Sequence, residues 1–284
     1  MDTDLSIFEA IILGLTQGAS EYAPISSSGH LILVPWFFGW PLLGGDTDFH
    51  KTFDVALHMG TLLGALIYFR HDVWRYLRAW IGTFRRRTIE TSDERVAWAL
   101  VVGTIPGVVL GALFDDVIQD NLGEPILIAV MLAVFGVVLW WVDRRMRSDR
   151  GFGTIGVRTG LFLGTAQALA LQPGISRSGI TMTAARAIGL DRGSAARFSF
   201  LLSMPIIAGA GIYKGIGLLD TGFQGYGAQF LWGFVASAIS GFLVIWGLLT
   251  YLKRHDYSVF MWYRLGIAAI ALALIAAGVR DATI

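Results

Sequence analysis

Residues 20–33 read SEYAPISSSGHLIL, which places a carboxylate, a proline, three serines and a histidine inside an otherwise apolar region. Such polar side chains are unfavourable in an apolar medium unless they are paired. A second stretch, LQPGISRSGIT at 171–181, interrupts another apolar region in the same way. Proline, glycine and serine together end one helix and begin another, so we expect a broken helix at each stretch.

The composition is that of a membrane protein. Of the 284 residues, 55% are hydrophobic and 15% are charged, whereas soluble domains are about 25% charged. The net charge of +1 argues against a nucleic-acid-binding surface, and a chain without cysteine has neither disulfides nor thiolate metal sites. We therefore expect an all-α polytopic membrane protein, with residues 1–284 forming a single integral membrane domain.

Six apolar segments are long enough to cross about 30 Å of hydrocarbon. They lie near 53–69, 96–114, 125–142, 198–218, 229–252 and 260–279. Two further apolar regions, about 6–42 and 156–190, contain the interrupted stretches and are not simple spans. We interpret each as a re-entrant hairpin, because irregular backbone is tolerated at membrane depth only inside protein or beside a wet cavity.

The two interrupted regions are related to each other. A shift of 150 residues lays 13–30 over 163–180 with seven identities in 18 positions, where chance gives roughly one or two. The following spans match at an offset of 145, through Phe53, Met59, Gly64, Ala65, Ile67 and Tyr68 on Phe198, Met204, Gly209, Ala210, Ile212 and Tyr213. The sequence thus predicts a duplication, with repeat one at about 6–143 and repeat two at about 156–280. Each repeat is a re-entrant helix-loop-helix hairpin plus three transmembrane helices.

The two repeats should have inverted topology, because three crossings per half is an odd number. Seventeen of the 22 Lys and Arg residues fall in four segments, at 70–95, 144–158, 186–197 and 253–254. The alternating loops 115–124 and 219–228 are nearly free of them. The positive-inside rule places the basic segments in the cytoplasm and both termini outside. The first hairpin then opens outward and the second inward, so their loops meet near the midplane, where inverted-repeat proteins bind ligands.

The two loops carry different chemistry. Gln17 and Glu21 share one face of the helix that leads into the first loop. In the second, Arg177 stands among hydroxyls and N–H groups at a new helix N-terminus, an arrangement that favours phosphate. Arg177 occupies the repeat position of Ser27, and an isoleucine occupies that of His30. The halves have therefore diverged into complementary roles.

Two motifs resemble one known family. QGASEYAPISSSGH at 17–30 is similar to the (E/Q)-x-x-x-E motif and Ser-rich, His-terminated loop of bacterial undecaprenyl-diphosphate phosphatases. PGISRSGIT at 173–181 is similar to that family's P-G-x-S-R-S-x-x-T signature, and the resemblance continues along nearly the whole chain, including Tyr263 and Arg264. The family's enzymes remove the terminal phosphate of undecaprenyl diphosphate outside the cytoplasmic membrane, need a divalent cation, and regenerate the lipid carrier for cell-wall synthesis.

The resemblance implies roles for the matching residues. Arg177 would clamp phosphate, His30 would be the nucleophile or a base activating Ser27 or water, and Glu21 would hold Mg²⁺ or Ca²⁺ or orient His30. Gln17, where many members have Glu, would be a weaker metal ligand. Further phosphate-binding positions are Ser26, Ser28, Gly29, Gly174, Ser176, Ser178 and Thr181. The expected partners are a polyprenyl diphosphate and the lipids of the bacterial inner membrane, and the sequence leaves a homodimer open.

Other interpretations compete with this one. Inverted repeats with broken helices also suit a transporter or flippase for a lipid phosphate or other anion; a lipid-binding scaffold is a more distant alternative. Arg264 and Arg70 fit snorkelling anchors at the membrane surface. Gln167 fits a residue packed between helices. The remaining histidines, His50, His58, His71 and His255, lie in loops or at span ends without ligand-like spacing.

Overall fold

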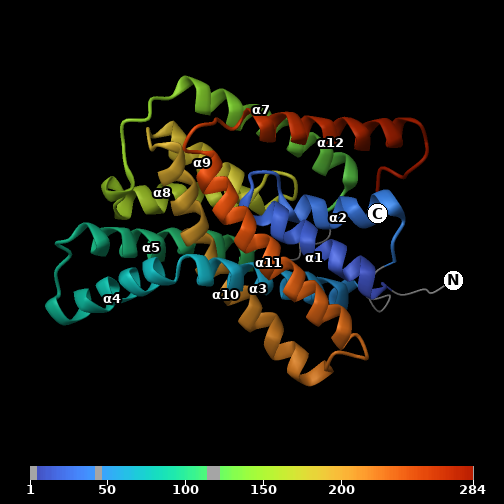
Figure 1. Cartoon of the computed structure of the whole chain (residues 1–284), viewed down its shortest axis with the longest axis horizontal. Coiled ribbons are helices and arrows are strands. Elements are labelled where there is room, and N and C mark those ends of the chain that lie inside the picture. The colour runs from blue at the N-terminus through green and yellow to red at the C-terminus, as the bar shows by residue number, and fades with distance from the viewer. Residues whose placement is uncertain (1–4, 42–46, 114–121, 284) are drawn as a thin grey trace.

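The computed structural model describes residues 5–41, 47–113 and 122–283, and every regular element in these ranges is a helix (Figure 1). The helices are α1 (Ile7–Tyr22), α2 (Ser27–Phe38), α3 (Thr47–Tyr68), α4 (Arg70–Arg86), α5 (Ser92–Leu113), α7 (Pro125–Arg145), η2 (Phe152–Thr154), α8 (Val157–Ala168), η3 (Leu169–Leu171), α9 (Arg177–Ala187), α10 (Arg192–Thr221), α11 (Gly227–Tyr251) and α12 (Ser258–Ala276). The predicted all-α class is confirmed. Most of the predicted outer loop 115–124 lies outside the described residues.

Five described helices, α5, α7, α10, α11 and α12, are long and apolar enough to cross a membrane. They coincide with five of the six predicted spans. The sixth, 53–69, lies within α3 apart from its last residue, and α3 passes the same test only together with α4 across an 84° bend. The chain is therefore a multi-pass membrane protein, as predicted.

Helix α4 differs from the prediction, which treated residues 70–95 as an Arg-rich connection. Four large apolar side chains, at Trp74, Leu77, Ile81 and Phe84, recur every three or four positions and are exposed. The guanidinium of Arg78 lies 4.5 Å from the ring centroid of Trp74. An apolar stripe flanked by arginines is typical of a helix that lies in the membrane interface.

The chain breaks at both predicted positions. Helix α1 ends at Tyr22 and α2 begins at Ser27, while α8 and η3 end before α9 begins at Arg177. Ser26 and Ser176, which precede the second helices, have φ values of 76° and 77°, in a region that residues other than glycine rarely adopt. Each of these four α-helices has 16 residues or fewer, too short to span a bilayer alone.

Glycines join the two halves through matched contacts. In α1, a Cβ atom at Gly14 would lie 2.3 Å from the carbonyl oxygen of Gly233 in α11. In α8, a Cβ atom at Gly164 would lie 1.9 Å from the carbonyl oxygen of Gly103 in α5. Only glycine permits such an approach, which is how small residues bring membrane helices together. Because Gly14 and Gly164 are repeat equivalents, these contacts support the duplication, which stays a prediction.

Candidate active site

The two loops meet inside the helix bundle, and a serine in each caps the helix that follows it. The Ser26 hydroxyl accepts a hydrogen bond from the Gly29 N–H (3.3 Å), and the Ser176 hydroxyl accepts one from the Gly179 N–H (3.1 Å). These bonds satisfy backbone donors at the starts of α2 and α9. Ser26 also accepts from the Gly174 N–H of the other loop (3.1 Å). The loops are therefore fixed to one another as well as to their own helices.

The remaining predicted phosphate-binding residues are also engaged within the protein. The Ser178 hydroxyl donates to the Ala23 carbonyl (3.0 Å), and the Thr181 hydroxyl donates to the Arg177 carbonyl (2.8 Å). Ser28 is half-buried and lies 3.4 Å from the Ser26 hydroxyl. Ser26, Gly29, Gly174, Ser176, Ser178 and Thr181 are all buried. In this arrangement they shape the two loops, whereas Ser27 and Arg177 are partly exposed.

Glu21 is the centre of the polar cluster. Its Oε1 atom accepts a hydrogen bond from Arg177 Nη2, which pairs a carboxylate from one half with a guanidinium from the other. Its Oε2 atom accepts from Ser27 Oγ (2.5 Å) and from Gln17 Nε2 (3.0 Å). Glu21 and Gln17 are buried, so this cluster lies within the protein interior. Arg177 also donates to the Ser203 carbonyl of α10 (3.4 Å).

His30 is oriented by other residues than Glu21. Its Nδ1 atom lies 2.7 Å from the Ser26 carbonyl, one helical turn before it, and its Nε2 atom lies 2.8 Å from the Tyr263 hydroxyl. No hydrogen bond joins His30 to Glu21 among the described residues, so Glu21 does not orient His30 as one of the predictions had it. Because a carbonyl only accepts, Nδ1 carries a proton, and Nε2 accepts from the Tyr263 hydroxyl in the neutral ring.

Arg264 corrects a second prediction. A snorkelling side chain would be exposed, but Arg264 is fully buried and binds backbone carbonyls only. It donates to Pro24 (3.2 Å) in the first loop and to Gly174 (2.8 Å) and Ile175 (3.1 Å) in the second. Two further bonds reach Leu132 and Met131 of α7. Arg264 therefore holds both loops against α7, with its charge facing carbonyl ends of broken helices.

His58 was also misplaced by the sequence interpretation, which put it in a loop or at a span end. It lies inside α3 with Nε2 at 3.5 Å from Glu21 Oε2. The signal was available, because an ionisable residue within an apolar segment is a functional candidate. Tyr263, beside His30, was part of the quoted Tyr-Arg pair, but nothing in the sequence linked it to residue 30.

The residues around Glu21 fit a divalent cation in part. No group of three or more His, Asp or Glu side chains in the described ranges could hold an ion by itself. The buried Gln17 Oε1 atom has no hydrogen-bond partner, however, while the Nε2 atom of the same amide donates to Glu21 Oε2. Mg²⁺ is usually bound by one or two carboxylates together with substrate phosphates. Glu21 and Gln17 are thus a suitable partial ligand set for a cation that a phosphorylated substrate completes.

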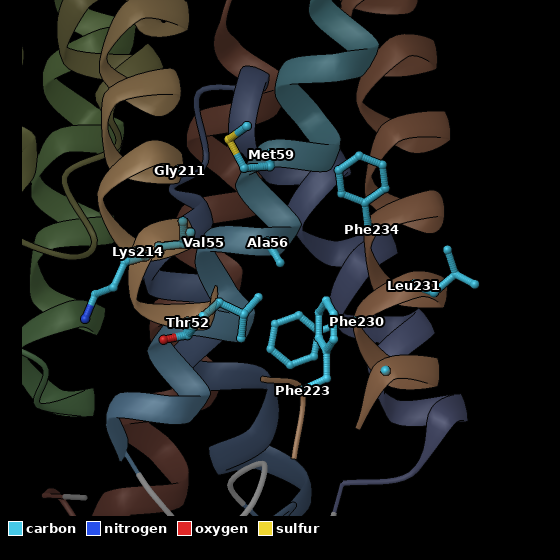
Figure 2. A pocket seen from close by; sticks show the side chains of 13 residues that line it. Thr52, Val55, Ala56, Met59, Gly211, Lys214, Phe223, Phe230, Leu231 and Phe234 are labelled. Carbon is cyan, nitrogen blue, oxygen red and sulfur yellow. The ribbon is translucent and has the colours of Figure 1, made fainter. Parts of the chain in front are cut away.

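An apolar groove lies between α3, α10 and α11, on the face of α3 that bears Met59 (Figure 2). It encloses about 350 Å³, with Gly211, Phe230 and Phe234 on the other walls and Thr52 and Lys214 as its polar residues. A second groove of about 300 Å³ lies between α3, α4, α5 and α10.

Several lining residues of the two grooves correspond under the predicted repeat. Met204, the repeat equivalent of Met59, lines the second groove. Leu100 and Val101 of α5 stand there in the places of Phe230 and Leu231 of α11. Each of these two pairs is separated along the chain by the same number of residues as Gly103 and Gly233. Both grooves offer hydrocarbon-lined surface to a lipid chain.

Comparison with known proteins adds a family to this geometry. The family model described as "Bacitracin resistance protein BacA" matches residues 10–270. The chain is 44% identical over 271 residues to an undecaprenyl-diphosphatase of Pelotomaculum thermopropionicum, covering 95% of this chain and 97% of that protein. It is 43% identical to the undecaprenyl-diphosphatase of Moorella thermoacetica over 95% and 98% of the two chains. For the undecaprenyl-diphosphatase of Thermomicrobium roseum the values are 41%, 95% and 99%.

Proposed function

Because the chain belongs to the bacitracin resistance protein BacA family, we propose that it hydrolyses undecaprenyl diphosphate to undecaprenyl phosphate and inorganic phosphate. The observation that carries the proposal is the contact of Glu21 and Ser27, from one loop, with Arg177 from the other. A nucleophile (Ser27), a base (Glu21) and a phosphate-binding guanidinium (Arg177) are thereby assembled at one point. A transporter for an anion would need the guanidinium but no hydroxyl paired with a carboxylate.

Ser27 is the nucleophile in this proposal. Its hydroxyl is partly exposed and already donates to Glu21 Oε2, so the carboxylate can accept the proton as the oxygen attacks the terminal phosphorus. The new Ser27 O–P bond replaces the bond between the terminal phosphorus and the bridging oxygen, and undecaprenyl phosphate leaves. Water then hydrolyses the phosphoserine, which releases inorganic phosphate and restores the hydroxyl. His30, with both ring nitrogens engaged, supports the start of α2.

Arg177 binds the terminal phosphate and offsets the charge that develops on its oxygens. In the structure its guanidinium pairs with Glu21. Transfer of that guanidinium to the phosphate would leave the Glu21 carboxylate a stronger base toward Ser27. Positioning and charge stabilisation of this kind account for most of the rate in phosphoryl transfer.

A divalent cation, Mg²⁺ or Ca²⁺, completes the proposed site. Glu21 and Gln17 would hold it, and it would supply charge neutralisation on the diphosphate oxygens. Oxygen donors suit both cations.

The lipid chain would lie outside the polar cluster, along apolar surfaces such as the groove at Met59 (Figure 2). The site would open to the outer side of a bacterial cytoplasmic membrane and recycle the lipid carrier for peptidoglycan synthesis. Both chain ends would then be outside. Two contacts support this arrangement: Arg280 donates to the Phe37 carbonyl (3.0 Å), and Gln229, beside the predicted outer loop 219–228, donates to the Leu5 carbonyl (3.2 Å).

The experiment is a phosphate-release assay on purified full-length protein in detergent micelles, with undecaprenyl diphosphate and Mg²⁺ or Ca²⁺. Wild type should release phosphate, whereas Ser27→Ala and Glu21→Gln should lose at least about a hundredfold in rate. His71→Ala, on the exposed face of α4, is the control and should match wild type. A wild type that binds the lipid without releasing phosphate would favour the transporter instead.

A further inference from the structure

His58 lies against Glu21, but the proposed reaction gives this histidine no role. Its ring lies in α3, across from α1, and its Nδ1 atom is 2.8 Å from the Asp54 carbonyl one turn earlier. A carbonyl only accepts, so Nδ1 is the protonated nitrogen. In the neutral ring, Nε2 then carries the lone pair, and Nε2 is the atom that faces Glu21.

This orientation is the one that metal-binding histidines have. Such residues usually donate their other ring N–H to a carboxylate or backbone carbonyl, which fixes the tautomer and aims the lone pair at the ion. The 3.5 Å between His58 Nε2 and Glu21 Oε2 also suits two ligands of one ion, which lie roughly 3 to 3.5 Å apart when each bond is near 2.1 Å. Without an ion or a proton between them, a lone pair and a carboxylate would repel.

A third donor stands at the same point. Gln17 Nε2 donates to Glu21 Oε2, while Gln17 Oε1 is buried without a partner. Rotation of this amide would present Oε1 in the place of Nε2 and would satisfy the unpartnered oxygen. Glu21 Oε2 has two lone pairs, so it can accept the Ser27 hydroxyl and still face an ion.

We infer that His58 Nε2 is a ligand of the divalent cation, together with Glu21 and Gln17. The inference rests on the cation of the proposed function but assigns it a nitrogen ligand. Its consequence is selectivity. Ca²⁺ prefers oxygen ligands, whereas imidazole suits first-row transition metals, among which Mn²⁺ also accepts carboxylate and carbonyl oxygens. The site should therefore prefer Mn²⁺ over Ca²⁺.

Electron paramagnetic resonance of bound Mn²⁺ tests the ligand directly and needs no turnover. Purified full-length protein in micelles is titrated with Mn²⁺ in the presence of inorganic diphosphate, and electron spin echo modulation is recorded for ¹⁴N coupling. The variants are His58→Gln, Glu21→Gln and His255→Gln. His255 is a matched control, because its Nδ1 atom also lies near the carbonyl one turn earlier (3.2 Å from Tyr251), but the residue is exposed.

The wild type and His255→Gln should bind Mn²⁺ with ¹⁴N modulation. His58→Gln should lose the modulation, bind Mn²⁺ at least about tenfold more weakly, and show a smaller preference for Mn²⁺ over Ca²⁺, because an amide oxygen replaces the nitrogen. Glu21→Gln should lose the bound ion. Modulation that persists in His58→Gln, or a wild type that binds no Mn²⁺ or binds it without modulation, would overturn the inference. Loss of phosphate release with ¹⁴N modulation intact would count against the proposed function alone.

Discussion

The loops at 23–30 and 173–180 begin their second helices in the same way but carry different chemistry. Each places a serine with positive φ before a helix and uses that hydroxyl to cap the helix three residues later. The next residue is Ser27 in one loop and Arg177 in the other, and these two are the partly exposed positions that meet at Glu21. The same capped helix start thus occurs in both loops, and the difference between the loops lies in the side chain that follows the capping serine.

The largest expected effect comes from making the two loops alike. Arg177→Ser gives the second loop the same side chain that Ser27 has in the first loop, and it removes the guanidinium from the proposed phosphate site. Phosphate release should fall by about a thousandfold or more, the range that a transition-state arginine supplies in phosphoryl transfer. Arg158→Ser, at an exposed arginine of α8, is the control. Equal rates for the two variants would remove the functional contrast between the loops.

Arg264 is shared by both loops, so its loss should affect them together. Arg264→Met removes a buried guanidinium that donates to five backbone carbonyls and should lower the free energy of unfolding by about 3 to 5 kcal/mol. Arg70→Met is the control, because Arg70 is exposed and bonds only within its own turn. Denaturation in mixed micelles would measure both variants; equal stabilities would restore the snorkelling interpretation of Arg264.

The capping serines allow a finer comparison. Ser26 accepts two N–H groups, from Gly29 and from Gly174 of the other loop, whereas Ser176 accepts one, from Gly179. Ser26→Ala should therefore destabilise the protein by about 1 kcal/mol more than Ser176→Ala. Thermal unfolding of the two variants under identical conditions measures the difference. Equal destabilisation by the two variants would mean that the bond between the loops contributes nothing, and the opposite order would contradict the prediction outright.

The smallest effect concerns His30, which has no counterpart in the second loop because Ile180 stands there. Tyr263→Phe removes the hydroxyl bonded to His30 Nε2. One hydrogen bond is worth about 1 kcal/mol, so kcat should fall about fivefold with little change in KM. Tyr213→Phe, at an exposed tyrosine of α10, is the control. A loss beyond a hundredfold would instead place His30 in the chemistry.

The sequence could predict the elements that depend on local pattern. Apolar length located the spans, and Pro-Gly-Ser clusters located both breaks, because these signals act within a few residues. It did not predict α4, because the seven arginines of the segment 70–95 were interpreted only as charge and the apolar stripe between them was overlooked. Arg186 shows the same limit, since it was counted as a cytoplasmic charge but is buried and paired with Asp143 (2.7 Å).

The site itself was predictable only in part. Glu21, Ser27 and Arg177 stood out because polar residues in apolar segments are costly, and the structure brings all three together. The contact of His30 with Tyr263 and the five acceptors of Arg264 are set by tertiary packing across more than 80 residues of chain. Gln167 of α8, the counterpart of Gln17, is buried, and neither its Oε1 nor its Nε2 atom is hydrogen-bonded. The structure does not explain this buried amide.

The central claim is that Ser27 attacks a phosphate that Arg177 of the other half holds. Lipid diphosphate labelled with ³²P in its terminal phosphate is mixed with protein, quenched within milliseconds, and the labelled residue is identified by mass spectrometry. The account predicts acid-stable phosphoserine at Ser27 in wild type and none in Arg177→Ser. Acid-labile label on His30, or equal labelling of Ser27 in both proteins, would contradict it.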